Sequence, residues 1–259
     1  MNRSLITKET KRTILIPSGT TRTSEVAARA LMKAGFEVVL GIPTGFYGAP
    51  RLIRVGLCRG IHHPEPGENQ DEFQRWLAEW VVVHPEMLVL PILEEVLFAV
   101  NEIREKCASP RSFICPPDSS LHYALSKYRS IEAAIKAKLA VPRTFFVREP
   151  DCEQANVPVK WREFPAILKW DNAYCDGRYV KGSNRVVWSL EEIEDCIAEL
   201  SHRRCGVLLQ SLVPGQGYGC FRLRDQDETV LSFAHRRLHE VPWTGGVSAM
   251  CEPSNVASM

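Results

Sequence analysis

Residues 164–215 constrain the fold more than any other stretch, because two apolar strands there enclose a polar loop and a helix. The first run, Phe-Pro-Ala-Ile-Leu-Lys, predicts a short buried strand over 164–169 that delivers a lysine at its end. The last run, 208–215, predicts a strand stopped by Pro-Gly, which cannot continue a ladder. A lysine could meet phosphate, the loop could cover it, and strand backbone could hydrogen-bond a base. The stretch therefore favours a nucleotide site.

The loop over residues 171–183 is too polar and too rich in glycine to belong to the core. Its candidate phosphate-binding residues are Gly177, Lys181 and Gly182, because glycine lets backbone N–H groups approach phosphate oxygens and lysine adds a point charge. The spacing matches neither a Walker A loop nor a Rossmann fingerprint, so a plain connection is the alternative. A helix over 189–200, opened by a capping box, follows as scaffold.

Composition and charge exclude several classes of protein. The chain has 32 basic and 31 acidic residues, so no net field favours nucleic acid or an anionic membrane surface. Nine cysteines without a Cys-x-x-Cys pair fit free thiols in a reducing compartment. The amino-terminal segment lacks the apolar core of a signal peptide, and charges and prolines interrupt the most apolar region. We therefore expect a cytoplasmic protein with no nucleic-acid partner and no membrane partner.

The first 117 residues alternate between apolar strands and amphipathic helices. Strands are predicted over 13–17, 36–40, 87–92 and 112–115, which indicates a parallel, Rossmann-like sheet. The first helix is expected to bury one face, made of Val26, Ala27, Ala30, Leu31 and Ala34. A capping box at Asn69 begins the next helix. Only one glycine follows the first strand where a dinucleotide fingerprint needs three, which disfavours a nicotinamide-dependent Rossmann enzyme.

The remaining segments predict further strands and helices, and the fold class is α/β. Helices are expected from about residue 119 and over 129–139, the second with Ile131, Ile135 and Leu139 inward. Strands follow over 144–147 and, as an antiparallel pair, over 220–223 and 229–234. Residues 41–66 predict no regular element, and the tail over 243–259 shows no periodicity and no partner.

Several motifs together resemble the ATP-grasp superfamily, especially its carboxylate–amine ligases of the carbamoyl-phosphate-synthetase type. They are Phe-Pro-x-x-x-Lys at 164–169, Ser-Lys at 126–127 leading to Val-Pro-Arg-Thr, Gln-Ser-Leu-Val at 210–213, Pro-x-x-Glu-Glu at 91–95, and Glu-x-Pro with Gly-Gly-x-Ser at 240–248. The resemblance implies a Rossmann-like pre-ATP-grasp domain over 1–117. An incomplete ATP-grasp domain over 118–259 is implied to follow, with a lid subdomain at about 142–213.

The resemblance also implies the residues that bind ATP. Lys127 and Lys169 would contact its phosphates, with solvent-exposed lysines as the alternative. The segment Gln210, Ser211, Leu212 and Val213 would pair through its backbone with adenine, although an acidic residue is usual where Ser211 stands. Arg237 is the catalytic candidate, because a guanidinium fork suits carboxylate or phosphate. Arg236 or Arg237 could serve, since alternation turns only one of them inward, and a solvated basic edge strand is the alternative.

No metal ligand is predicted in this chain. In ATP-grasp ligases a Glu on one late strand and a Glu-x-Asn pair on another hold Mg²⁺. In this chain the only Glu and Asn after Ser248 are Glu252 and Asn255. They form Glu-x-x-Asn in a segment that resembles a loop. The metal-binding part is therefore expected to be missing. The histidines and acids of residues 62–71 predict a loop rather than a metal site.

The activity implied by the resemblance is an ATP-dependent ligation with ATP and Mg²⁺ as cofactors and a small-molecule carboxylate as substrate. ATP would phosphorylate the carboxylate, and an amine would attack the resulting acyl phosphate. Binding and charge neutralisation would be the protein's contribution. The apparent truncation leaves one alternative from another class, a catalytically inactive ATP-grasp remnant or interaction module.

Overall fold

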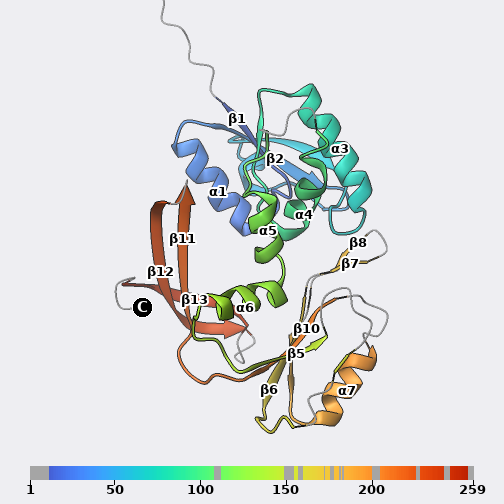
Figure 1. Cartoon of the computed structure of the whole chain (residues 1–259). Helices are drawn as coiled ribbons and strands as arrows, with labels where there is room; N and C mark the ends of the chain where they lie inside the picture. Colours follow the sequence, from blue (N-terminus) through green and yellow to red (C-terminus); the bar gives the residue numbers. More distant parts are fainter. Residues whose placement is uncertain are drawn as a thin grey trace, which may run out of the picture. The chain divides into compact units, whose positions relative to one another are not determined.

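The structure is a computed structural model that describes residues 12–107, 112–148, 155–156, 160–171, 173–175, 178–180, 182, 184–199, 205–225, 228–241 and 246–255. The chain divides into two compact units, Met1–Ser211 and Leu212–Met259, which are described separately (Figure 1). The predicted domain boundary after residue 117 lies inside the first unit and stays a prediction. Among the described residues, no helix has the length and apolar character needed to span a membrane.

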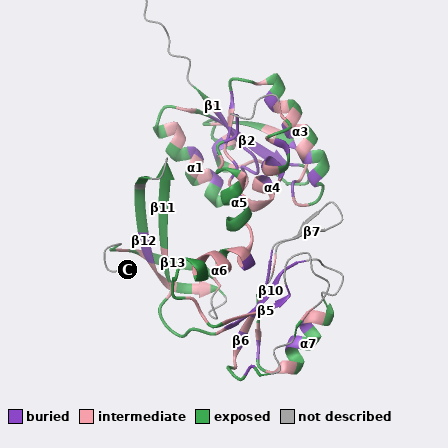
Figure 2. Cartoon of the chain, viewed as in Figure 1, coloured by how far each residue is buried: buried purple, intermediate pink, exposed green. Residues whose placement is uncertain are grey.

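A parallel sheet opens the first unit. Its strands are β1 (Thr13–Ile16), β2 (Glu37–Pro43), β3 (Arg59–His63) and β4 (Leu88–Val89), in the order β3-β2-β1-β4. Val89 also forms a parallel bridge with Phe113. The central strands β1 and β2 are mostly apolar because both faces of the sheet are covered, and buried residues concentrate on them (Figure 2). The predicted parallel sheet is confirmed.

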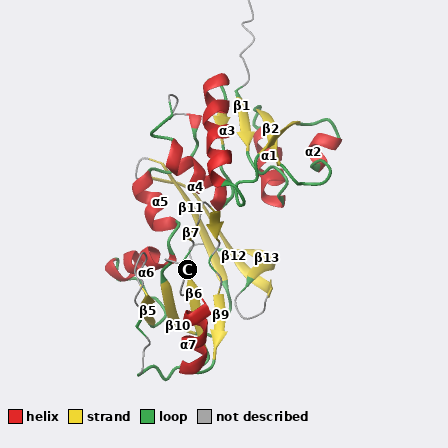
Figure 3. Cartoon of the chain, turned by 90° about the vertical axis from the view of Figure 1, so that its right-hand side faces the viewer, coloured by secondary structure: helices red, strands yellow, loops and turns green. Residues whose placement is uncertain are grey.

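Helices cover the two faces of this sheet (Figure 3). The buried side chains form two separate clusters. On one face, Leu15 packs with α3 (Gln70–Val83) and α4 (Glu94–Ile103). On the other, Ile14 and Ile16 pack with α1 (Arg22–Lys33) and α2 (Arg51–Arg54). The alternation along β1 therefore supplies both layers of the core.

The buried face of α1 matches the predicted one only in part, because Ala27 and Leu31 pack against the core but the deepest positions are others. Val26 is 63% exposed, whereas Ser24 and Ala28 are fully buried. Hydrogen bonds at the start of the helix explain why Ser24 is buried. Thr21 caps the helix by accepting a hydrogen bond from the Ser24 backbone N–H at 3.1 Å, and Ser24 Oγ donates to Ser18 O at 3.1 Å. A serine thus occupies an inward position, and the apolar stripe is rotated away from Val26.

Residues 41–66, for which no element was predicted, contain the end of β2, the short helix α2 and strand β3. Gly41 lies against the ring of His63, because a Cβ added at Gly41 would come within 2.7 Å of ring atoms. A side chain at position 41 would collide with this ring and come within 3.0 Å of Pro17 Cα. Neither the single turn of α2 nor the sequence Arg-Gly-Ile-His-His has a periodicity that would reveal it.

His63 makes the stability of this sheet sensitive to pH. It is 1% exposed, Nδ1–H donates to Pro64 O at 2.7 Å, and Nε2 accepts from the Ser18 backbone N–H at 3.1 Å. Burial lowers the pKa of His63, with the Pro64 carbonyl partly opposing the shift and His62 adding to it. Protonation would place a second proton on Nε2, directly facing the Ser18 N–H.

We therefore expect the protein to lose stability as the pH falls below about 6.5. In this range His63 is protonated in the unfolded chain but stays neutral in the folded protein. The loss continues until the pH reaches the lowered pKa of the folded state. Urea unfolding at pH 7.5 and 5.5 measures it. His63→Asn should be less stable at both pH values but should depend less on pH, by at most about 1.4 kcal/mol between the two pH values. Exposed His122→Asn should behave as wild type, and an unchanged pH dependence in His63→Asn would refute the assignment.

The rest of the first unit contains two helices, an antiparallel sheet and a covering helix. The helices are α5 (Asp118–Ala124) and α6 (Lys127–Lys136). The sheet consists of β5 (Thr144–Arg148), β6 (Ala166–Trp170), β9 (Asn184–Val187) and β10 (Val207–Ser211), in the order β5-β10-β6-β9. The hairpin of β7 (Ala173–Cys175) and β8 (Arg178–Val180) lies between β6 and β9 in the chain. The two strands predicted within residues 164–215, β6 and β10, are neighbours, with Lys169 paired to Leu208.

The helices of this region match their predicted positions, but the predicted buried face of α6 does not match the observed one. α7 (Leu190–Glu199) begins with the predicted capping box, in which Glu192 N–H donates to Ser189 Oγ at 3.1 Å. In α6, however, Ile135 is 47% exposed and Leu139, beyond its end, is 64% exposed, so neither faces a core. Tyr128 is the buried residue of α6, and its ring centroid lies 4.5 Å from that of Phe146.

The second unit is a three-stranded antiparallel sheet of β11 (Tyr218–Asp225), β12 (Glu228–Val241) and β13 (Val247–Ser254). The predicted pair is confirmed, with Phe221 opposite Phe233. The prediction of a tail without a partner is wrong, because β13 pairs with β12 and places Glu252 opposite Arg236. The long β12 strand offers hydrogen-bonding groups along its second edge, and these order a segment that has no periodicity of its own.

Candidate functional site

A cavity of about 250 Å³ lies in the first unit where α6, β6 and β10 meet. Two lysines, Lys127 and Lys169, line it, and we refer to it as the two-lysine cavity. Its other lining residues are Glu94, Ala124, Leu125, Ser130, Ile131, Leu208 and Gln210. The volume is just below the ~300–1,000 Å³ typical of small-molecule sites, so it matches a part of a nucleotide. The fold brings together three residues that were predicted to bind ATP.

Lys169 reaches the cavity through the alternation of β6. Ala166, Leu168 and Trp170 point into the core of the antiparallel sheet, and Lys169 therefore lies on the opposite face. Burial lowers the pKa of Lys169, and the nearby charge of Lys127 lowers it further. A partly desolvated ammonium beside a second one is unfavourable. The lining also contains the carboxylate of Glu94, and a bound phosphate would add further compensating negative charge. The cavity is therefore electrostatically suited to phosphate.

Lys127 is the first residue of α6 and is tied to the end of β6. Its Nζ donates a hydrogen bond to Trp170 O at 2.8 Å. Ser126 caps the helix, since its Oγ accepts from the Arg129 backbone N–H at 3.1 Å. The cap fixes the first turn of α6, and the contact with Trp170 fixes the lysine beside the strand that carries Lys169.

Asp171 is a site residue that sequence reasoning missed. It directly follows β6, is 4% exposed, and accepts a hydrogen bond from Ser126 Oγ at 2.6 Å and from the Tyr128 backbone N–H at 3.0 Å. Its own backbone N–H donates to Gly206 O at 2.9 Å. The available signal was an acidic residue immediately after a buried strand. Nothing in the sequence pairs it with a helix start far earlier in the chain.

Gln210 lies on β10, is 2% exposed, and donates from Nε2 to Thr144 Oγ1 at 2.9 Å. The Ser211 backbone N–H donates to Arg143 O at 3.0 Å. Leu212 and Val213 follow the strand, belong to the second unit, and are 37% and 64% exposed. Pairing of this segment with adenine stays a prediction.

Gly182 lies close to the backbone at the end of β6. A Cβ added to it would stand 2.0 Å from Trp170 O and 2.7 Å from Asp171 O, so no larger residue fits there. Trp170 O is also the acceptor for Lys127, which places Gly182 beside one of the two lysines. Gly177 and Lys181 lie outside the described residues, and their roles stay predictions.

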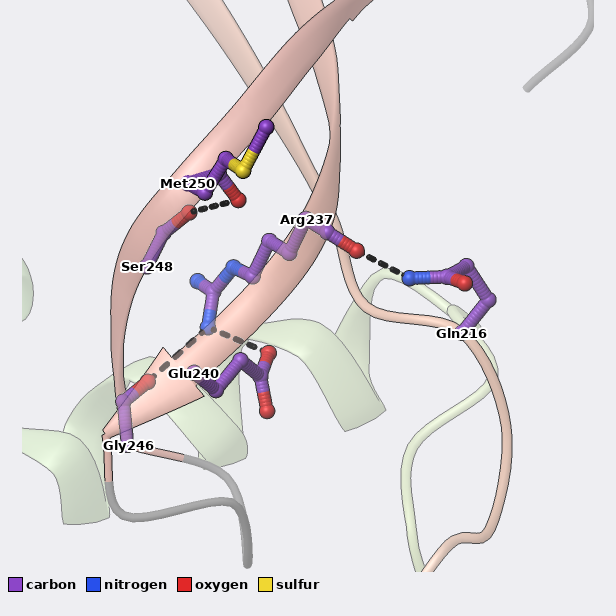
Figure 4. Close-up of polar contacts among 6 residues, drawn as sticks. All are labelled: Gln216, Arg237, Glu240, Gly246, Ser248 and Met250. Atoms are coloured by element: carbon purple, nitrogen blue, oxygen red, sulfur yellow. Dashed lines mark hydrogen bonds and ion pairs between the residues drawn. The ribbon is translucent and has the colours of Figure 1, made fainter.

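Arg237 lies in the second unit, on β12, and Figure 4 shows its contacts. Its Nη1 donates to Glu240 Oε1 at 3.2 Å and to Gly246 O at 3.3 Å. Its backbone carbonyl accepts from Gln216 Nε2. The adjacent Arg236 forms an ion pair with Glu252 at 2.5 Å. Each arginine thus faces a carboxylate of its own sheet, and a catalytic role for Arg237 stays a prediction.

Among the described residues, no group of three or more His, Cys, Asp or Glu side chains is arranged to hold a metal ion. Glu252 lies on a strand rather than in a loop, but its carboxylate is engaged by Arg236. Both oxygens of Asp171 accept hydrogen bonds within the first unit. The charged side chains that line the two-lysine cavity are Lys127, Lys169 and Glu94.

Comparison with known proteins gives matches among solved structures only. No protein-family model matches the chain, and no curated protein matches it significantly. The complex of biotin carboxylase with βγ-ATP from Campylobacter jejuni has a TM-score of 0.60 at 12% identity, covering 88% of this chain and 52% of that chain. The biotin carboxylase domain of Hydrogenobacter thermophilus 2-oxoglutarate carboxylase, with MgADP, ADP and bicarbonate, has a TM-score of 0.52 at 15% identity, covering 80% and 45%.

A ligase of another kind also matches. D-alanine–D-alanine ligase from Bacillus anthracis has a TM-score of 0.50 at 10% identity, covering 95% of this chain and 71% of that chain. This chain spans about half the length of the biotin carboxylase chains that it matches. At identities of 10% to 15%, these likenesses identify a shared fold.

Proposed function

We propose that the two-lysine cavity binds the phosphates of ATP, on the premise that this chain has the ATP-grasp fold, as its motifs indicated. The observation that carries the proposal is the meeting of Lys127 and Lys169 at one cavity in a fold known for nucleotide binding. The lowered pKa of Lys169 supports it, because the site gains most from an anion that neutralises both ammonium groups. Gln210 on the neighbouring strand also lines the cavity and would lie toward the base in this arrangement.

The reaction that we propose is the ATP-dependent joining of a carboxylate to an amine through an acyl phosphate. In such a reaction the lysines would hold the phosphate chain and offset the negative charge of the transferred phosphoryl group. Because both ammonium groups are positioned before the nucleotide arrives, little reorganisation is needed at the moment of transfer. Arg237 is the proposed contact for the carboxylate, and it would exchange its contact with Glu240 for the substrate.

One observation favours the alternative of an interaction module. Phe221, Leu223, Leu231 and Phe233 of the second unit are 48% to 62% exposed. They form two cross-strand pairs of β11 and β12, so one face of this sheet presents a continuous apolar surface. An interaction module of this kind would not need to bind a nucleotide.

Nucleotide binding decides between the two functions. We expect ADP and ATP to raise the melting temperature by several degrees near saturation, because a ligand at ~100 times its Kd adds about 2.7 kcal/mol. Adenosine, which lacks phosphate, should bind much more weakly. Lys127→Met should remove most of the ADP effect, whereas Lys136→Met, on the exposed last turn of the same helix, should keep it. If wild type responds equally to ADP and adenosine, or to neither, the cavity is not a phosphate site.

A further inference from the structure

Three hydrogen bonds join the start of α6 to the end of β6. Lys127 Nζ donates to Trp170 O at 2.8 Å, Ser126 Oγ donates to Asp171 Oδ2 at 2.6 Å, and Tyr128 N–H donates to Asp171 Oδ1 at 3.0 Å. Two of the three end on one carboxylate. The two donors to the Asp171 carboxylate are Ser126 and Tyr128, which flank Lys127. Asp171 therefore holds the helical turn on both sides of that lysine.

The position of Asp171 links this contact to Lys169. Asp171 lies two residues beyond Lys169, where its backbone N–H is fixed to Gly206 O at 2.9 Å. Asp171 is 4% exposed, and both of its carboxylate oxygens have partners, as a buried charge requires. The chain that carries one lysine is thereby attached to the chain that carries the other.

Such an attachment would oppose the repulsion between the two lysines, whose charges interact, since Lys127 lowers the pKa of Lys169, in a cavity that Glu94 also lines. The far end of α6 adds little restraint, since Ile135 and Lys136 are exposed there and pack against no core. A small displacement of the first turn would carry Lys127 away from Lys169. Phosphate would then meet one ammonium instead of two.

We propose that Asp171 is a positioning residue of the phosphate site, which holds Lys127 at a set distance from Lys169 so that both ammonium groups converge on one phosphate chain. The proposal rests on the proposed function. Asp171 touches no phosphate itself, because its oxygens are directed at Ser126 and Tyr128. Its effect is confined to ligands that carry phosphate.

The test compares two substitutions at this position and two ligands by isothermal titration. Asp171→Ala should weaken ADP binding at least tenfold and change adenosine binding less than threefold. Asp171→Asn should stay within threefold of wild type for both ligands, because its Oδ1 can accept from Tyr128 N–H and its amide can donate to Ser126 Oγ. Asp195→Ala, which removes an exposed carboxylate on α7, should leave both affinities unchanged.

A general structural role would lower the affinity for ADP and adenosine together, and that result in folded Asp171→Ala would overturn the proposal. Should Asp171→Ala fail to fold, Ser126→Gly decides, because glycine is nearly as good a helix cap but lacks the hydroxyl. It should weaken ADP binding at least threefold and spare adenosine, and unchanged ADP affinity would overturn the proposal. Absence of ADP binding in wild type would instead refute the proposed function.

Discussion

Replacing Lys169 with methionine is expected to weaken ADP binding by about 10–100-fold while making the ligand-free protein slightly more stable. The loss follows from removing one charge-assisted contact to phosphate, worth about 1.5–3 kcal/mol. The gain in stability of the ligand-free protein comes from removing the same charge. Burial and Lys127 lower the pKa of Lys169, which means that the folded state disfavours the charged form that predominates at neutral pH. Methionine keeps most of the length of the side chain without the charge.

The size of the stability gain is limited, because Lys169 retains partial contact with solvent, which screens its charge. We expect an increase in melting temperature of about 1–3 °C near pH 7. The unfolded chain keeps its lysine protonated up to about pH 10.5, whereas the folded chain releases the proton earlier. Wild type should therefore gain stability as the pH rises through this window, and its difference from Lys169→Met should shrink.

Scanning calorimetry of the ligand-free proteins at pH 7 and 9.5, with ADP titrations at pH 7, measures both effects. Lys136→Met is the matched control, since it removes an exposed lysine from α6 and should change neither property. A variant at Lys169 that is less stable than wild type and still binds ADP normally would contradict the role assigned to this lysine.

Replacing Gly182 with alanine is expected to be the most damaging single change in the loop. The new Cβ would stand 2.0 Å from Trp170 O and 2.7 Å from Asp171 O. Both atoms belong to the backbone at the end of β6, an interior strand of the antiparallel sheet, and cannot move as the tip of a flexible side chain could. The backbone at position 182 must therefore shift away from β6, at a cost of about 1–3 kcal/mol.

The shift should also reduce ADP affinity, because Trp170 O holds Lys127 and Asp171 holds its helix. Urea unfolding and ADP titration measure the two losses. Gly67→Ala is the matched control: its Cβ would meet only side-chain atoms at 3.9 Å, so the expected change is within about 0.5 kcal/mol. A Gly182→Ala protein with wild-type stability would show that the loop does not approach β6 this closely.

Local patterns predicted much of this protein because they report which face of an element is buried. Apolar runs and helix caps in the sequence correctly located β1, β6, β10, α3 and α7. The motifs also located Lys127, Lys169 and Gln210, which the fold brings to one cavity. A short motif can identify such residues because strand alternation and a helix start determine the direction of each side chain.

The predictions from local patterns were wrong where a hydrogen bond to another segment of the chain determined the structure. The inward face of α1 was set by the hydroxyl of Ser24, which donates to Ser18 O. The tail without periodicity became β13 because the edge of β12 supplied its hydrogen-bond partners. In both cases the deciding partner was a backbone group, and backbone groups leave no trace in the side-chain sequence.

By itself, the sequence determined the α/β class, the parallel first sheet, and the residue types that a phosphate site requires. Only the tertiary structure decided that the two lysines share a cavity, that Asp171 joins the segments carrying them, and that Gly182 closes against the same strand end. The physical reason is that a side chain's direction depends on its near neighbours, whereas the distance between two charges depends on contacts between segments far apart in the chain.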